Sequence, residues 1–200
     1  MMSRRFLRGD TIIEVLFAVT IFSALAVSSL SIMNRTVGTA QRSLEVSLVR
    51  QEMNSQAEAL RFIHDSYISG SDSAPAKVWA NLTASANVIT DAQLATLDSL
   101  VSNCAPPSSR AFVINPRTMS IVTNASPNYF RSAQIYSQLR YNPDNSIATN
   151  GVEGIWVQQL AGVTGGTDYR DFHIRACWAA PGGNVPVTLS TIVRLYVPSP

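Results

Sequence analysis

One glutamate, Glu14, lies at the start of a segment that otherwise has the composition of a membrane span. Residues 15–33 contain no charged residue and no proline. As an α-helix this run is about 28 Å long, close to the ~30 Å hydrocarbon core of a bilayer. An ionised acid in lipid is unfavourable by roughly 2.5–3.5 kcal/mol on the translocon scale. We therefore expect Glu14 to have a partner or a function of its own.

The histidines and the common catalytic motifs give no sign of an active site. His64 lies beside Asp65 in a segment of helical pattern, and His173 lies in a strand-like segment, so we expect both to be surface residues or to bond a partner within the protein. The sequence contains no G-x-S-x-G nucleophile elbow, no phosphate-binding glycine loop and no H-E-x-x-H zinc motif. We predict that the protein is not an enzyme and that it uses no cofactor.

The residues that precede Glu14 carry a resemblance to a known family. Arg4, Arg5 and Arg8 form a short basic leader, Gly9 follows, and Glu14 comes five residues after that glycine. Together with the long apolar run, this pattern resembles the N-terminus of type IV prepilins and of type II secretion pseudopilins. The resemblance covers residues 4–34.

The resemblance implies a processing step and an assembly step. A membrane prepilin peptidase would cut after Gly9, which makes Asp10 the mature N-terminus and, in this family, the site of N-methylation. Glu14 would then pair with the N-terminal amine of a neighbouring subunit during filament assembly. The implied partners are the peptidase, other pilin or pseudopilin subunits and the inner-membrane assembly machinery. The family usually has Phe where this chain has Asp10, and Leu where it has Ile12.

Other residues add to what the resemblance implies. Asp10 and the size of the exported domain favour a minor pilin or pseudopilin over a simple shaft subunit. Some pseudopilins bind calcium through loop carboxylates, for which Asp144, Asp168 and Asp171 are the candidates here. Their spacing is unspecific, so we predict no metal site.

Two other interpretations of the N-terminus remain open. The segment could be an ordinary signal anchor that contains a glutamate. It could also be a cleaved secretory signal, with residues 12–22 as its apolar region and cleavage before Val27, after the Ala24-Leu25-Ala26 sequence. The position of Glu14 and the apolar character that continues to Met33 argue against such a signal.

The alternative function is that of an exported protein that binds DNA or a surface ligand. It would need a basic or aromatic patch on the exported domain, for which the candidates are Arg131, Arg140, Tyr129, Tyr136 and Tyr141. Charge does not favour nucleic acid, because removal of the three leader arginines changes the net charge from +2 to +2 − 3 = −1. The leader arginines instead predict topology, with the N-terminus cytoplasmic and the C-terminal domain exported. The resemblance implies that this domain lies on the cell surface after assembly.

The chain contains two cysteines, Cys104 and Cys177, both in the part expected to be exported. An even number of cysteines outside the cytoplasm favours a disulfide. Two buried free thiols are the alternative. A metal pair has less support, because no Cys-x-x-Cys spacing accompanies the cysteines.

Hydrophobic periodicity predicts one long helix over residues 11–67, with Gly70 near its end. We expect a leader at 1–9, a transmembrane or filament-core half at 10–34, an amphipathic half at 35–68 and an exported globular domain at 69–200. One face of the amphipathic half should pack on that domain. Its residues are Val46, Val49, Met53, Ala57, Leu60, Ile63 and Tyr67.

The exported domain should be an antiparallel sheet packed on that helix, which gives a pilin-like α+β fold. We expect a loop at 69–76, a short helix at 78–82 and a second at about 91–101, which opens with a Thr90–Gln93 capping box. Residues 162–168 should form a flexible loop. Strands are predicted at 111–114, 119–122, 134–141, 154–160, 172–178 and 187–197.

The position of the mature N-terminus distinguishes the three interpretations of this segment. N-terminal sequencing of the protein from membranes of its native host should begin at Asp10. A sequence that begins at Val27 would identify a secretory signal, and an intact Met1 would identify a plain anchor.

Overall fold

The computed structural model describes residues 10–70, 72–84, 88–89, 104, 110–123, 129–181, 183 and 185–197. The chain divides into two compact units, Met1–Arg42 and Ser43–Pro200, and the long helix contributes to both. The leader, with Gly9, and the expected helix at 91–101 with its capping box lie outside the described residues.

Helix α1 (Asp10–Ile68) confirms the predicted long helix. It continues through Gly38, the only glycine within it. It ends where expected, because Gly70 adopts a left-handed conformation with φ of 68°. The Gly70 N–H donates to the Tyr67 carbonyl at 3.1 Å. Glycine enters this conformation without the steric penalty of a Cβ atom, which makes it a common helix terminator.

Helix α2 (Ala74–Leu82) contains the predicted helix at 78–82 but begins four residues earlier. The loop predicted at 69–76 is therefore wrong for its last three residues. The Ser73 side chain accepts a hydrogen bond from the Ala76 N–H, and Pro75 lies in the first turn. A serine cap followed by proline is a helix start, because proline lacks only an N–H that the first turn leaves unpaired.

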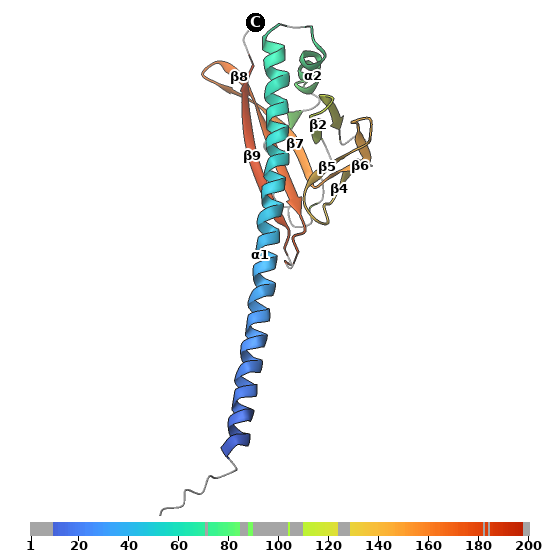
Figure 1. Ribbon diagram of the computed structural model, residues 1–200. Coiled ribbons are helices and arrows are strands. Elements are labelled where there is room, and N and C mark those ends of the chain that lie inside the picture. Colours follow the sequence, from blue (N-terminus) through green and yellow to red (C-terminus); the bar gives the residue numbers. More distant parts are fainter. Residues whose placement is uncertain are drawn as a thin grey trace, which may run out of the picture. The chain divides into compact units, whose positions relative to one another are not determined.

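The main sheet has the strand order β3-β2-β7-β8-β9, and β1 pairs with β7 beside β2 (Figure 1). Apart from the parallel β1–β7 pair, its strands are antiparallel. The predicted hairpin around Asn115 is confirmed, with each strand shifted by one residue. The strands are β1 (Val88–Ile89), β2 (Phe112–Asn115), β3 (Ser120–Thr123), β7 (Ile155–Thr164), β8 (Thr167–Trp178) and β9 (Val187–Tyr196).

The predicted flexible loop at 162–168 is wrong, because β7 and β8 form one long hairpin through this segment. Thr164 and Thr167 are the last paired residues, and only Gly165 and Gly166 form the turn. Both glycines have positive φ, 59° and 82°. A two-residue turn with positive φ at both positions matches the right-handed twist of a hairpin.

A second, three-stranded sheet has the order β4-β6-β5. Its strands are β4 (Phe130–Arg131), β5 (Gln138–Tyr141) and β6 (Ile147–Glu153). The strand predicted at 134–141 is wrong in its first half, because only its last four residues form β5. Sequence patterning missed β6 entirely, since an Asn-Gly pair in its middle is typical of a turn.

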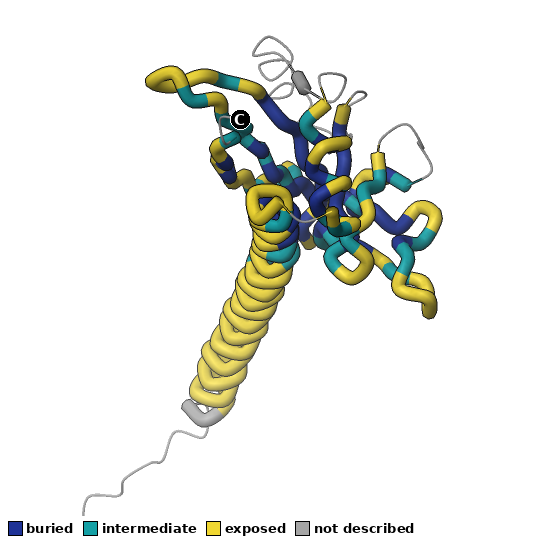
Figure 2. The backbone as a smooth tube through the Cα atoms, turned by 90° about the horizontal axis from the view of Figure 1, so that it is seen from above, coloured by how far each residue is buried: buried dark blue, intermediate teal, exposed yellow. Residues whose placement is uncertain are grey.

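The core of the Ser43–Pro200 unit lies between α1 and one face of the main sheet, where buried segments of both meet (Figure 2). Val49, Met53, Ala57, Leu60 and Ile63 are buried as predicted, whereas Val46 is partly buried and Tyr67 is exposed. Phe172, Ile174, Ala176 and Trp178 of β8 are all buried, as the alternation in this strand predicted. Cys104 and Cys177 form the expected disulfide.

A buried glutamine links α1 to the sheet. The Gln56 Nε2 atom donates to the Ile114 carbonyl at 2.7 Å, and the Ile114 N–H donates to Gln56 Oε1 at 2.8 Å. β2 pairs with β7 only at Phe112, so the side-chain amide satisfies strand groups beyond the end of that pairing. Buried backbone groups left without such a partner are strongly destabilising.

Replacement of Gln56 by Met should lower the free energy of unfolding by about 2–4 kcal/mol, because the shape is kept while Ile114 loses both partners. Chemical denaturation measures the change. Gln51→Met on the exposed side of the same helix is the matched control and should change stability by less than about 0.5 kcal/mol. Equal effects of the two substitutions would contradict this role of Gln56.

Candidate functional site

The N-terminal part of α1 is an apolar helix whose described side chains are exposed. From Ile12 to Val37, every large apolar side chain is between 51% and 73% exposed. Figure 2 shows the same segment as continuously exposed. By length and composition the helix can cross a membrane, and none of its most apolar window is buried within the chain. An apolar surface of this extent is typical of a region that contacts a membrane or another protein.

Four hydroxyl groups in this segment form hydrogen bonds within the helix itself. Thr20 donates to the Phe17 carbonyl at 2.9 Å, and Ser23 donates to the Val19 carbonyl at 2.7 Å. Ser28 and Thr36 bond the carbonyls four residues earlier in the same way. Such bonds give these four hydroxyl donors an acceptor when lipid or a neighbouring helix surrounds the segment.

Glu14 differs from these hydroxyl residues. It is the only charged residue between Ile12 and Asn34. It is exposed, and no described side chain forms a hydrogen bond or an ion pair with its carboxylate. Toward the C-terminus, its neighbours on the helix surface are Phe17 and Ala18, which are apolar and exposed. A carboxylate in these surroundings would be strongly stabilised by a cation that another molecule supplies.

The second part of α1 belongs to the folded unit and is held by polar bonds that lie several turns apart. Trp178 Nε1 donates to the buried Glu45 carboxylate at 2.9 Å. His64 Nε2 lies 2.8 Å from the Tyr196 carbonyl oxygen, while the His64 ring packs edge-on against Trp79. His64 therefore has a hydrogen-bond partner, as expected.

Glu45 does not belong to the apolar face that the sequence predicts, yet it is buried. Its side chain is 7% exposed because the indole of Trp178 reaches it from the end of β8. The helical period predicts which residues face a sheet but not which polar group will meet a buried Trp N–H. Only the tertiary fold brings these two residues together.

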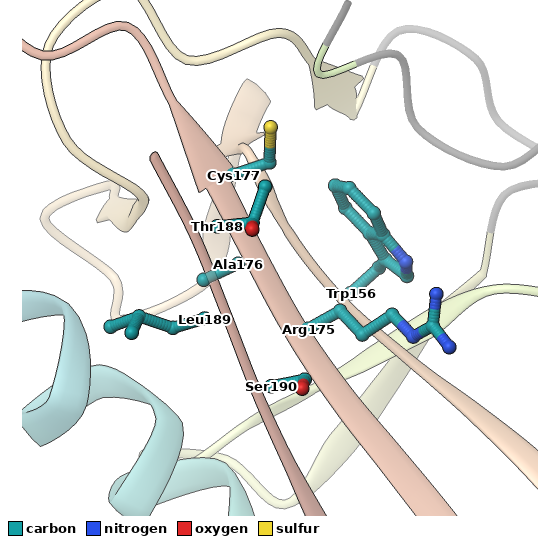
Figure 3. A pocket seen from close by; sticks show the side chains of 7 residues that line it. All are labelled: Trp156, Arg175, Ala176, Cys177, Thr188, Leu189 and Ser190. Atoms are coloured by element: carbon teal, nitrogen blue, oxygen red, sulfur yellow. The ribbon is translucent and has the colours of Figure 1, made fainter. Parts of the chain in front are cut away.

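A small pocket of about 150 Å³ lies mainly on the sheet face opposite α1, beside the disulfide. Trp156 of β7 and Arg175 of β8 are directly paired across the two strands, and their side chains lie together beside Cys177 (Figure 3). Thr188 and Ser190 of β9 complete this side of the pocket. The pocket combines no nucleophile and base with hydrogen-bonding geometry.

Residues considered for DNA or surface binding do not form an open basic patch. Tyr129, Tyr136 and Tyr141 are partly buried and pack against the core. Arg140 forms an ion pair with Glu153 at 3.2 Å, whereas Arg131 is exposed. Arg140 thus has a carboxylate neighbour, which weakens its attraction for phosphate groups.

A mixed-charge cluster links the β2–β3 turn to α1 and β5. The Arg117 guanidinium lies 3.9 Å from the centre of the Tyr141 ring. Burial, followed by the charge of Glu52, raises the pKa of Tyr141 to about 12. Burial also raises the pKa of Glu52, and the charge of Arg117 opposes that shift. The arrangement connects the β2–β3 turn, α1 and β5.

The three aspartates weighed for calcium are not brought together. Among the described residues no group of three or more potential ligands could hold a metal ion. Asp171 forms a two-pronged ion pair with Arg194, at 2.8 and 2.7 Å. Asp144 accepts hydrogen bonds from the hydroxyl and the N–H of Ser146, which lower its pKa.

The chain was compared with family models, with curated proteins and with solved structures, and none of them matches it. The residues and their geometry are therefore the only basis for a functional conclusion.

His173 gives the folded unit a pH dependence. Burial, with a contribution from the Arg175 charge, lowers its pKa from 6.5, and Asp171 opposes the shift. The unfolded chain therefore binds a proton at higher pH than the folded chain, so stability falls as the pH drops through 6.5. Denaturation curves from roughly pH 8 to 5 should show a smaller loss for His173→Gln than for the parent. Identical slopes would contradict this assignment.

Proposed function

We propose that this protein is a structural subunit, a minor pilin or pseudopilin, of a type IV pilus or a type II secretion-like filament. In this proposal a prepilin peptidase removes residues 1–9, and the mature chain begins at Asp10. The N-terminal apolar part of α1 is held first in the membrane and then in the core of the filament. The protein acts by assembly and not by catalysis.

The observation that carries the proposal is the exposed apolar helix in which Glu14 is the only charged residue between Ile12 and Asn34. A plain anchor needs only the apolar residues, and Glu14 makes membrane insertion less favourable. A neighbouring subunit's N-terminal amine would provide the missing positive charge. Burial of a charge that has found its partner is far less unfavourable than burial of the charge alone, so assembly would be coupled to pairing.

Two further features support the proposal. α1 continues without interruption from its exposed apolar part into the folded unit, so that the proposed filament core and the exported domain share one helix. The disulfide between Cys104 and Cys177 suits a domain outside the cytoplasm.

The topology that follows has the N-terminus in the cytoplasm and the globular domain outside. Arg4, Arg5 and Arg8 remain on the cytoplasmic side until the leader is cut off. After assembly the domain is carried on a filament at the cell surface. Methylation of Asp10 belongs to the same proposal and rests on the family resemblance alone.

Replacement of Glu14 by Val should leave membrane insertion and cleavage intact but reduce incorporation into sheared filaments at least about tenfold. Immunoblots of the membrane and filament fractions measure this. Thr20→Val is the matched control: it removes a polar group from the same exposed helix, but that hydroxyl bonds only the Phe17 carbonyl in the structure. Normal incorporation of the Glu14 variant, or an equal defect in both variants, would contradict the proposed role.

A further inference from the structure

The last strand of the main sheet, β9, has an open edge. It is a ten-residue strand at the end of the order β3-β2-β7-β8-β9. Its pairing with β8 is regular over its whole length, from Tyr169↔Tyr196 to Trp178↔Val187. No strand in the described part of the chain pairs with its other edge.

The hydrogen-bond pattern identifies the backbone groups on that edge. The Val197 N–H donates to the Asp168 carbonyl at 2.8 Å, so odd-numbered residues turn their backbone groups toward β8. The even-numbered residues Ser190, Ile192 and Arg194 must then direct their N–H and C=O groups outward. The Tyr196 carbonyl agrees with this alternation, because it bonds His64 of α1 instead of β8.

Farther along the strand these outward groups have no cover. Within the described residues, no backbone hydrogen bond to the outward groups of Ser190, Ile192 or Arg194 is formed. Residues 187–193 contain no charge and no proline, and the pairing contains no bulge. Natural sheet edges are usually protected by a charged residue, a proline or a bulge. The Ile192 side chain is also 58% exposed.

A groove of about 270 Å³ lies between this strand and α1. It is lined by Arg50, Met53 and Asn54 of the helix and by residues 189–191 of β9. Arg50 is exposed and forms no ion pair with a described residue. The helix positions three and four residues away from it are Val46, Ser47, Met53 and Asn54, so no acid lies within reach on its own helix.

We propose that an extended segment of a partner protein adds to the β9 edge as a further strand and directs a carboxylate toward Arg50. The outward groups of Ser190, Ile192 and Arg194 would supply the backbone bonds, as in other cases of strand addition. The exposed cation would select an acidic segment. This binding site is independent of filament assembly through Glu14.

A second copy of this chain is a less suitable occupant. Pairing of β9 with the β9 strand of another copy around a two-fold axis would bring both Arg50 side chains to one groove. No described acid lines that groove to compensate two like charges. An acidic segment of another protein avoids this repulsion.

The test uses the full-length protein in detergent micelles and three synthetic peptides. The first alternates threonine and valine and carries one central aspartate. The second is identical but N-methylated at alternate residues, which blocks its bonding edge. The third has asparagine in place of the aspartate. Affinity is measured by calorimetry, and hydrogen exchange is followed by NMR at each backbone amide of β9.

We expect the first peptide to bind and to slow exchange at the amides of Ser190, Ile192 and Arg194. The amides of Thr191 and Val193, which already face β8, should not change. The N-methylated peptide should bind at least about tenfold more weakly, because it loses backbone bonds and keeps the side chains.

Two variants test the residues themselves. Ile192→Pro removes one outward N–H and should weaken binding about tenfold, whereas Ile192→Thr keeps that N–H and should bind like the parent. Arg50→Gln should weaken binding of the aspartate peptide but not of the asparagine peptide. This second variant keeps the test valid if the proline variant fails to fold.

Three results would overturn the proposal. The first is no binding of the unmethylated peptide, and the second is equal binding of the N-methylated one. The third is protection of the outward amides from hydrogen exchange in the absence of peptide, if that protection becomes stronger as the protein concentration rises. This would show that a second copy occupies the edge.

Discussion

The structure depends on one constraint: the apolar side chains of a single continuous helix must be shielded from water in two different surroundings. In the Ser43–Pro200 unit, α1 is covered on one side by the sheet, and its buried residues are part of the core. In the other unit its apolar side chains have no protein cover. The hydrophobic effect makes that exposure in water unfavourable along the whole segment. Lipid, and then neighbouring helices in a filament, are the covers that we propose.

The folded unit holds its part of the helix with hydrogen bonds as well as apolar contacts. Glu45 bonds to the end of β8, Gln56 bonds to β2, and His64 bonds to the end of β9. These bonds are far apart along the helix, so they fix both its position and its rotation on the sheet. Since buried polar groups bond only in a narrow range of geometry, they specify one packing arrangement more strictly than apolar side chains do.

The sequence predicted the helix well because its signals are long and repeated. Nineteen residues without charge or proline, and an apolar face from Val49 to Ile63, leave little choice. The strands were harder to predict. β6 carries an Asn-Gly pair that is typical of a turn, and Gly162 was taken as a loop residue although it lies under the Tyr169 ring within β7. In both cases tertiary pairing overrides local propensity.

For the candidate site, the sequence alone identified Glu14, because a charge in an apolar run is visible without a structure. It could not show that Glu45 is buried against Trp178, or that the edge of β9 is open, because both depend on contacts between distant segments. The β9 edge and Glu14 would serve different purposes: one would recruit a partner segment and the other would join subunits.

In the proposed assembly, Glu14 pairs with the N-terminal amine of a neighbouring subunit. The most direct measurement is solid-state NMR on filaments that contain a mixture of subunits labelled with ¹⁵N and subunits labelled with ¹³C. We expect a through-space correlation between the amine nitrogen of Asp10 in one subunit and the carboxyl carbon of Glu14 in another. Filaments that contain the protein but lack this intermolecular correlation would contradict the claim.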